Sequence, residues 1–472
     1  MKRLIICSLV LAGSGALALA QQPVAPTTPV NEQSVQFYRA LLAEGGTQAV
    51  IQAVTAAVLE AMKQGPLTGE AGRATLASAG ASSVPASSAP ATPLVIPKTW
   101  ADSVVWKGDV RYRTELRKDR GSNTKDPNAD VEYDRLRARL GLEAQVNDNV
   151  KAVVRLTTDG YGSDKTGNGG DPQSGNQDLN NGASKKGIYL DLAYLDWNFF
   201  GPDNSELHGL AGKMANPFIT QNDDLVWDPD TTPEGLAFKG QYDLSPFTLL
   251  GNAGYFILNN QNSATAQYNQ TSLYAIQGAA KYEFCPEVTL TLGMSYYGFN
   301  NIQGSSVNNV DLMGKAKGTT YYGNDVTVAN GTTNFSNGYS VVQPFVQLDM
   351  FPTIGNRIVP ISVFAQGVDN LDATTLSKGE MFGATLGKAK NPQTAEFGAS
   401  WAKIDRDSTL GMWTDSDRWG GGTDGEGYKL YLKYTILKNL AGQITYFDDR
   451  KGIASGEGTG YQRWQFDLTA SF

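Results

Sequence analysis

Basic side chains recur at alternate positions in three consecutive segments between residues 111 and 155, and two lysines farther along continue the pattern. Residues two apart in an extended chain share one face, so each segment would present its cations as a row. Guanidinium groups keep their charge at physiological pH and offer several donors, which suits them to guide anionic groups. The candidate basic residues are Arg111, Arg113, Arg117, Arg135, Arg137, Arg139, Lys151, Arg155, Lys213 and Lys239.

A second concentration of charge is acidic. The stretch from Asn216 to Asp230 carries several aspartates and a glutamate lies just beyond it, which gives the set Asp223, Asp224, Asp228, Asp230 and Glu234. We hypothesise that this stretch, or the longer polar segment 160–186, folds inward opposite the basic rows. Facing charges of opposite sign would create a transverse field that orients dipolar solutes. The alternative is that the basic rows are structural and pair with carboxylates across the interior.

Other chemistry finds little support in the sequence. The single histidine, His208, has no serine–aspartate or metal-ligand grouping around it in sequence. Asp228-x-Asp230 and Asp415-x-Asp417 do not continue with the spacing of a calcium-binding loop. We therefore predict no catalytic residues, no metal site and no cofactor. A hydrolase built on serine and histidine is an alternative, and it would have to use His208.

The composition narrows the class of protein. The chain has 472 residues, a formal charge of −8 and 41% hydrophobic residues, with a mean hydropathy of −0.31. Transmembrane helices need about 20 nearly uninterrupted apolar residues, and nucleic-acid binding relies on an excess of Lys and Arg. Both classes are therefore excluded. The 52 glycines and 10% aromatics favour strands and turns over helices.

The N-terminal segment differs from the rest of the chain. Residues 1–20 are predicted to be a secretory signal peptide, because Lys2 and Arg3 precede an apolar run and Ala18-Leu19-Ala20 forms a cleavage site. Residues 21–64 carry apolar residues at helical spacing, which predicts a short helical segment in the periplasm. Residues 65–102 are rich in Ala, Ser and Pro and predict a flexible linker.

From residue 103 to residue 472 the apolar residues recur with a period of two. The clearest strand is the last, where Trp464, Phe466 and Leu468 alternate with polar residues and Phe472 ends the chain. The same alternation accompanies the basic rows, so strands are the elements that position them. Alternation alone fits a soluble sandwich with its apolar faces inward as well as a membrane barrel with its apolar face outward.

The lengths of the connections distinguish these two folds. Seven short turns alternate strictly with eight long polar loops, as in an up-and-down barrel with one plain and one elaborated rim. A Greek-key sandwich needs some connections that cross between sheets. We predict an all-β transmembrane barrel of about sixteen antiparallel strands. This count includes a weak strand at Thr409–Trp413 and treats residues 369–391 as a long loop.

Two further features point to a membrane and to a family. Aromatic residues gather beside the predicted short turns, as a girdle at a membrane interface would require. The segments Gly108-Asp-Val-Arg-Tyr-Arg113, Tyr133-Asp-Arg-Leu-Arg-Ala-Arg-Leu-Gly141 and Val150-Lys-Ala-Val-Val-Arg155 resemble the opening hairpins of the bacterial putative outer-membrane porin family. Phe472 resembles the signal by which the outer-membrane assembly machinery recognises its clients. The resemblance spans about residues 104–472 and implies a water-filled diffusion channel that assembles as a homotrimer.

The sequence thus predicts a porin in the outer membrane of a Gram-negative-type bacterium, surrounded by outer-membrane lipids and with its N-terminal segment in the periplasm. It would pass ions and small hydrophilic solutes passively. The alternative is a structural barrel tethered through its N-terminal helices, which would not conduct. The basic rows favour anions, whereas the negative formal charge favours cations, so both selectivities stay open.

Overall fold

A computed structural model gives the fold of the C-terminal part of the chain. It describes residues 103–472 apart from 121–129, 160–169, 181, 200–203, 222, 260–269, 308–319, 330 and 457. The predicted signal peptide (1–20), helical segment (21–64) and linker (65–102) lie outside the described residues. Within the described ranges, no helix is long and apolar enough to cross a lipid bilayer.

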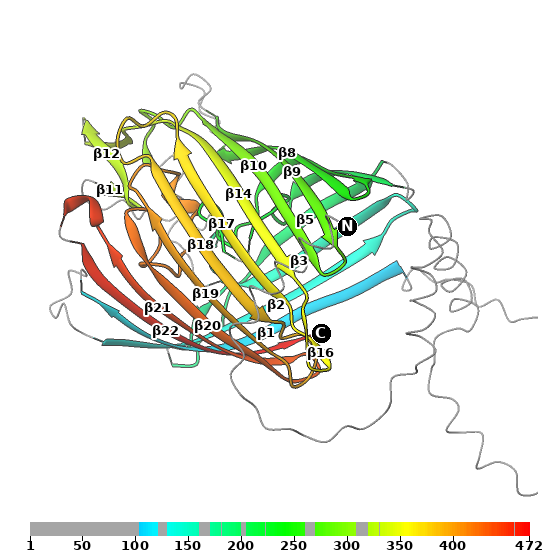
Figure 1. Cartoon of the computed structure of the whole chain (residues 1–472). Coiled ribbons are helices and arrows are strands. Elements are labelled where there is room, and N and C mark those ends of the chain that lie inside the picture. Colours follow the sequence, from blue (N-terminus) through cyan, green and yellow to red (C-terminus); the bar gives the residue numbers. More distant parts are fainter. Residues whose placement is uncertain are drawn as a thin grey trace, which may run out of the picture. The chain divides into compact units, whose positions relative to one another are not determined.

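Sixteen long strands form the wall of a closed antiparallel barrel (Figure 1). Each wall strand pairs with the next along the chain, and the last pairs with the first, which closes the ring. The wall strands are β1 (Val104–Asp119), β2 (Asp130–Gln145), β3 (Val150–Thr158), β5 (Ile188–Asn198), β6 (Ser205–Lys213), β7 (Glu234–Leu244), β8 (Phe247–Asn259), β9 (Thr271–Cys285), β10 (Val288–Asn300), β14 (Tyr339–Met350), β17 (Ile361–Asn370), β18 (Lys378–Gly387), β19 (Ala395–Ile404), β20 (Gly425–Leu437), β21 (Leu440–Lys451) and β22 (Thr459–Ser471).

Short elements lie in the connections. β4 (Gln177–Asp178) pairs with β2 beyond the end of β3. β11 (Thr320–Tyr321), β12 (Asn324–Ala329) and β13 (Thr332–Phe335) form a small sheet between β10 and β14. β15 (Thr353–Ile354) and β16 (Arg357–Ile358) form a hairpin between β14 and β17, and single 3₁₀ turns occupy Gly411–Trp413 and Ile453–Ser455.

The alternation of side chains along the strands decides which face points outward. In β22, Trp464 and Phe466 are 42% and 40% exposed, whereas Arg463 and Gln465 are 5% and 2% exposed. The apolar face therefore lies outside and the polar face inside, the reverse of a soluble sandwich. An apolar outer surface of this extent suits a lipid environment. The predicted transmembrane barrel fold is confirmed.

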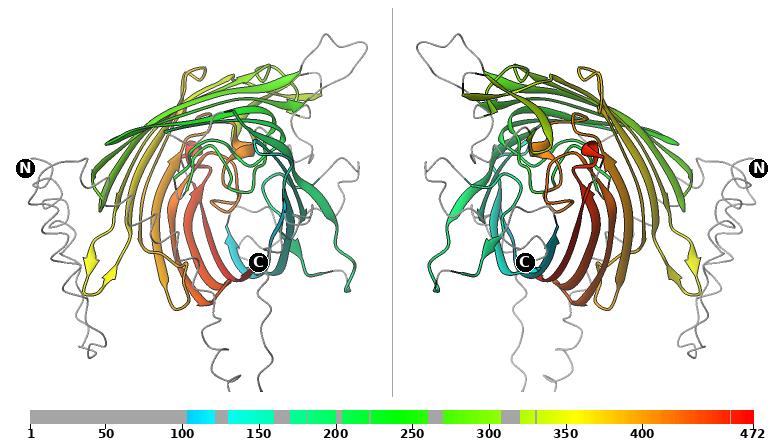
Figure 2. Two further views of the ribbon diagram at one scale, coloured as in Figure 1. Left: turned by 90° about the vertical axis from the view of Figure 1, so that its right-hand side faces the viewer. Right: turned by 90° about the vertical axis from the view of Figure 1, so that its left-hand side faces the viewer.

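Part of the barrel interior is apolar, which the sequence did not predict. Inward residues such as Phe256, Tyr297 and Ile404 pack into one hydrophobic cluster with residues of the β10–β14 connection and of two loops that fold into the barrel. These are the β6–β7 loop (residues 214–233) and the β19–β20 loop (residues 405–424), and both views of Figure 2 place them inside the ring of strands. Two loops that fold into a barrel need apolar wall residues to pack against, because their own apolar side chains must be removed from water.

Short and long connections alternate along most of the chain, but the connection 351–360 on the short rim is longer than the connection 371–377 on the long rim, and the predicted short turn Asp405–Ser408 lies in the long β19–β20 loop. Two predicted elements were also wrong. Thr409–Trp413 is not a strand; it lies in the β19–β20 loop and contains a 3₁₀ turn. The predicted loop 369–391 contains a wall strand, β18. The two errors cancel, so the strand count was right although one strand was misplaced.

The first and last strands meet at the end of the chain. The Phe472 amide donates to the Gly108 carbonyl at 3.0 Å, and the Gly108 amide donates to the Phe472 carbonyl at 2.9 Å. The Phe472 ring lies over Gly108, where a Cβ atom would come within 2.5 Å of it. A side chain at position 108 would therefore displace the terminal ring.

Candidate pathway through the barrel

The basic rows predicted from the sequence lie side by side on the inner face of β1, β2 and β3. Arg111 is the register partner of Arg137, and Arg113 is the register partner of Arg135. Like charges directly opposite each other on neighbouring strands are destabilising. The rows therefore need carboxylate partners, and these come from several distant parts of the chain.

The carboxylate of Asp109 is shared by two arginines of β2. Its oxygens lie 3.0 Å from Arg137 Nη2 and 2.7 Å from Arg139 Nε. On β3, Arg155 Nε donates to Asp191 of β5. Two further charged pairs of these rows are Arg135–Asp178 at 2.8 Å and Arg113–Asp467 at 2.6 Å.

The other predicted basic residues have varied partners. Arg111 donates to Asn176 Oδ1 at 2.6 Å, and Arg117 donates to Tyr133 Oη at 2.7 Å. Lys151 Nζ lies 4.0 Å from Asp196, Lys213 Nζ lies 3.0 Å from Glu234, and Lys239 lines a cavity described below. The ion pairs that the structural alternative requires are thus present in the wall, and the rows are not a surface of uncompensated positive charge.

The acidic residues separate into two groups. Asp230 faces the basic rows, since its Oδ1 atom lies 3.5 Å from Nη1 of both Arg137 and Arg139. Asp223, Asp224 and Asp228 are buried within the β6–β7 loop and its contacts. Glu234 was predicted with the acidic loop, but it is the first residue of β7.

Buried carboxylates and three inward-facing glutamines hold the β6–β7 loop in place. Gln277 of β9 accepts from the Ile219 amide at 2.7 Å and donates to the Ile219 carbonyl at 2.9 Å. Gln366 of β17 accepts from the Leu225 amide and donates to the Asp223 carbonyl. Gln343 of β14 donates to the Asp224 carboxylate. Because a glutamine amide matches the two groups of a peptide, these residues act as surrogate strand partners.

An aromatic cluster packs the β6–β7 loop against the barrel interior. The Trp227 ring lies 5.8 Å from both the Phe218 and Tyr297 rings, and 4.9 Å from the Trp413 ring of the β19–β20 loop. Trp227 is 2% exposed. The two loops therefore share one apolar contact inside the barrel.

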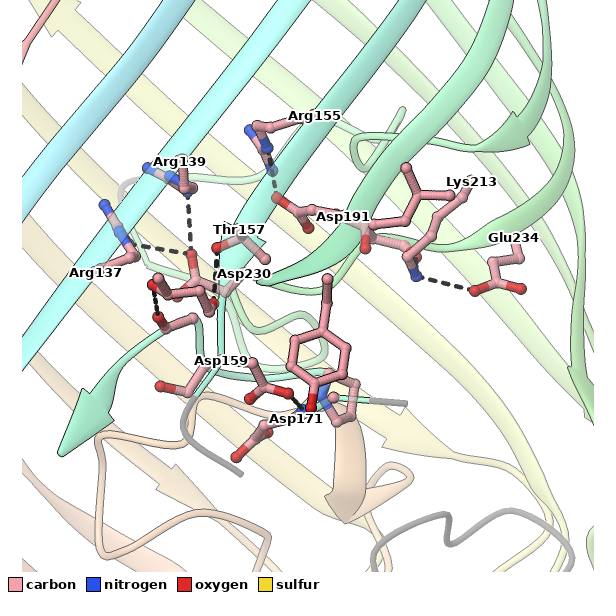
Figure 3. Close-up of a pocket in the computed structure, with 18 residues that line it drawn as sticks. Arg137, Arg139, Arg155, Thr157, Asp159, Asp171, Asp191, Lys213, Asp230 and Glu234 are labelled. Atoms are coloured by element: carbon pink, nitrogen blue, oxygen red, sulfur yellow. Dashed lines mark hydrogen bonds and ion pairs between the residues drawn. The ribbon is translucent and has the colours of Figure 1, made fainter. Parts of the chain in front are cut away.

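A cavity of about 450 Å³ lies between the basic rows and the β6–β7 loop, toward the rim of long connections. Arg137, Arg139, Arg155 and Lys213 supply its positive charges, and Figure 3 shows them around the same space as the carboxylates. The acidic lining residues are Asp159, Asp171, Asp191, Asp230 and Glu234. Charged side chains of both signs therefore line this one cavity.

A second cavity of about 380 Å³ lies toward the rim of short turns. Its polar lining includes Lys239, Lys281 and His208, whose Nδ1 atom lies 2.6 Å from Asp196 Oδ1. Residues 215–219 of the β6–β7 loop form its apolar side. Both cavities border this loop, which therefore lies between them and the rest of the interior.

Burial raises the pKa values of the aspartates in the β6–β7 loop, but neighbouring cations reverse the shift at one of them. Burial raises the pKa of Asp224 to about 6, although the Val226 and Trp227 amides donate to its carboxylate. Burial, together with Asp415 and Asp230, raises the pKa of Asp228 well above its usual range. Burial would also raise the pKa of Asp223, but Lys429 and Arg418 outweigh it and leave the pKa lowered.

The raised pKa of Asp224 predicts a pH-dependent stability. A carboxyl whose pKa is raised by folding supports the folded state fully below its unfolded pKa, and this support is lost as pH rises through about 6. Asp224→Asn is uncharged at every pH. Between pH 4 and pH 8 we expect the variant to gain up to about 3 kcal/mol relative to wild type. Denaturant midpoints at both pH values measure this difference.

The matched control for this prediction is Asp243→Asn, which removes an exposed aspartate at the end of β7. The Asp243 carboxylate accepts hydrogen bonds from Gln241 and Thr248 at the rim. The control should track wild type across the same pH range. If the stability of Asp224→Asn also follows that of wild type across this pH range, the pKa of Asp224 is not raised by burial.

Sequence reasoning missed several residues of this interior. Gln277, Gln343 and Gln366 each lie on an inward position of an alternating strand, but a lone polar residue there carries no distinct signal. The β19–β20 loop was divided between a predicted strand and a predicted loop, so its inward fold was missed. No cluster of three or more His, Cys, Asp or Glu side chains arranged to hold a metal occurs in the described ranges.

Several solved bacterial porins resemble this chain at low sequence identity. No curated protein sequence matches the chain. The solved porin of Rhodopseudomonas blastica is 11% identical, with 78% of this chain and 100% of that chain covered and a TM-score of 0.40. Pseudomonas putida OprB is 12% identical, with 78% and 94% covered and a TM-score of 0.47. Salmonella typhi OmpF is 11% identical, with 79% and 99% covered and a TM-score of 0.43.

A family model gives the more specific result. The model described as "Putative porin" matches residues 117–336, which contain the second and third basic rows and the whole β6–β7 loop. The resemblance that the opening hairpins indicated is therefore confirmed, since residues 117–336 of this chain match the putative porin family.

Proposed function

We propose that the protein is an outer-membrane porin, a water-filled channel through which ions and small hydrophilic solutes diffuse down their gradients. One observation carries the proposal: the closed barrel exposes apolar side chains outside, while charged side chains line cavities of about 450 and 380 Å³ inside. Lipid favours the outer face and water the inner one. The match to the putative porin family supports the same class.

The arrangement of charges supports a finer proposal about selectivity. Arg137 and Arg139 of the wall pair with Asp230 of the β6–β7 loop at 3.5 Å, and all three line the larger cavity, so groups of opposite sign would create an electric field within it. Such a field orients dipolar solutes. Because carboxylates accompany the cations of the lining, we expect weak discrimination between anions and cations. Zwitterions and uncharged polar solutes are then the best-suited cargo.

The assembly is also part of the proposal. The family resemblance supports a homotrimer in the outer membrane of a Gram-negative-type bacterium, with outer-membrane lipids around it and the N-terminal segment in the periplasm. The pore-lining role is proposed for the predicted basic residues, with Asp230 as their acidic counterpart. A structural barrel tethered through the N-terminal segment would lack any permeability.

Liposome swelling tests the proposed channel directly. Liposomes that contain the purified barrel are placed in iso-osmotic solutions of uncharged sugars of increasing size. We expect rapid swelling in the smallest sugar and a rate that falls steeply with size, because the lining cavities are narrow. Liposomes without protein provide the control. The absence of swelling in every sugar would refute the channel and favour the structural barrel.

The proposed assembly signal gives a prediction for Phe472. Phe472→Ala keeps the two backbone hydrogen bonds with Gly108 but removes the terminal ring. We expect a several-fold loss of folded barrel in the outer membrane of cells, with refolding of the purified chain in detergent nearly unchanged. Phe466→Ala, which removes an exposed ring from the outer face of the same strand, is the control. Equal membrane levels for the two variants would refute the role of Phe472.

A further inference from the structure

We propose that the β19–β20 loop is a second constriction element, which fills the part of the lumen beside β17–β20 and confines solutes to the passage along β2, β3 and β5–β7. This inference rests on the proposed channel function. The β19–β20 loop is packed inside the barrel, since Ser408, Thr409 and Leu410 have no exposed surface. A connection that merely covered a rim would keep such residues in water.

The first set of contacts fixes the β19–β20 loop to the wall at β1 and β22. Asp417 Oδ1 lies 2.9 Å from Arg463 Nη2, and Asp417 Oδ2 lies 3.5 Å from Arg113 Nη1. Arg463 also donates to the Asp417 carbonyl at 3.1 Å. Arg463 and Arg113 outweigh burial and hold the pKa of Asp417 below its usual range, so this contact persists in acid.

A second set of contacts joins the β19–β20 loop to the β6–β7 loop. The Asp228 amide donates to the Trp413 carbonyl at 2.6 Å, and the Ser416 amide donates to Asp228 Oδ2 at 2.9 Å. Arg418 Nη2 lies 3.0 Å from Asp223 Oδ2. The two loops are therefore linked by backbone, side-chain and aromatic contacts along their length.

A third set of contacts comes from the connections above the barrel. Asn324 of β12 accepts from the Gly411 amide at 2.8 Å and donates to the Thr409 carbonyl at 2.8 Å. Gln173, in the connection between β3 and β5, donates to the Thr414 carbonyl at 2.7 Å. The β19–β20 loop is thus held from several directions and cannot swing out without breaking all of these bonds.

The distribution of free space follows the position of the β19–β20 loop. The cavities of about 450 and 380 Å³ are lined from β2, β3 and β5–β9 together with connections on that side. Between the β6–β7 loop and the wall at β17–β20, the cavity lined by Asp223, Ser400 and Lys429 measures only about 10 Å³. None of its lining residues belongs to the β19–β20 loop, but Arg418 of that loop donates to both Asp223 and Ser400 and so closes the space beside them. Removal of the β19–β20 loop should therefore open the filled side.

The register of the wall allows a clean excision. Ile404 and Gly425 are register partners at the ends of β19 and β20, so residues 405–424 can be replaced by Asn-Gly, which suits a two-residue hairpin turn. In planar bilayers we expect the excised barrel to conduct roughly twofold or more above wild type, because conductance rises with the open cross-section. Larger sugars should also enter liposomes that contain it.

The matched control is an excision at the other rim. Met350 and Ile361 are register partners, so residues 351–360, which include the exposed β15–β16 hairpin, can be replaced by Asn-Gly in the same way. The control should keep wild-type conductance. If the excised β19–β20 barrel folds but conducts as wild type does, the loop is not a constriction and the inference is overturned.

A variant with two point changes tests the constriction if the excised barrel does not fold. Asp417→Asn together with Trp413→Ala loosens the loop at two of its anchors, and we expect a smaller increase and larger fluctuations in conductance. Unchanged conductance in this folded variant would also overturn the inference. If wild type does not conduct but the excised barrel does, the loop is a plug and the proposed free diffusion is what fails.

Discussion

Replacement of Trp227 by alanine is expected to destabilise the barrel by about 3–5 kcal/mol, the usual cost of deleting a large buried aromatic side chain. Trp227 is 2% exposed and contacts the rings of Phe218, Tyr297 and Trp413. Its removal leaves a cavity where the β6–β7 and β19–β20 loops meet. Both loops should then loosen, so noise in the conductance should rise as well.

Denaturant unfolding of the refolded barrel measures this loss. The midpoint should fall for Trp227→Ala while the slope of the transition stays constant. Trp106→Ala is the control, because Trp106 has the same side chain but is 60% exposed on the outer face. Equal midpoints for the two variants would mean that Trp227 does not anchor the interior.

Neutralisation of Arg137, Arg139 and Arg155 is expected to make the channel strongly cation-selective. The triple change to glutamine leaves Asp109, Asp191 and Asp230 without these cationic partners beside the larger cavity. A unit charge gains about 1 kcal/mol from an opposite charge 4 Å away in water, so two or three carboxylates, screened by salt, should shift the permeability ratio by about tenfold or more. The reversal potential in a salt gradient reports this ratio.

A control with the same change in net charge separates local from overall effects. Lys118, Lys378 and Lys388 lie in exposed positions, with 56%, 75% and 64% of their side chains exposed. Their joint change to glutamine should leave the reversal potential near the wild-type value. If both triple variants shift it equally, the basic rows have no special position in the passage.

The sequence was sufficient for the barrel but not for the placement of every strand. β18 was missed because Gly379, Gly383 and Gly387 interrupt its alternation. Gly383 is needed where it stands, since a Cβ atom there would lie 2.7 Å from the Phe364 ring across the sheet. Thr409–Trp413 was included as a weak strand, partly because an even number of strands returns both chain ends to the same side of the membrane. Leu410 and Trp413 instead pack inside the barrel.

The charge rows were visible in the sequence, whereas most of their partners were not. Asp467 is 354 residues from Arg113 along the chain, and Asp230 is 93 residues from Arg137. Such pairs form only when the ring closes and the β6–β7 loop folds inward. A pattern of local periodicity reveals which face a charge occupies, but it does not reveal which carboxylate will lie opposite.

Single-channel recording in a planar bilayer, followed by the reversal potential in a salt gradient, tests the proposed mixed-charge channel most directly. We expect stable openings whose current rises linearly with voltage, because a water-filled lumen has no fixed barrier to either ion. The reversal potential should correspond to a permeability ratio within about threefold of unity, since carboxylates accompany the cations of the lining. A barrel without conductance would contradict the channel, and a strong preference for one sign of ion would contradict its balanced lining.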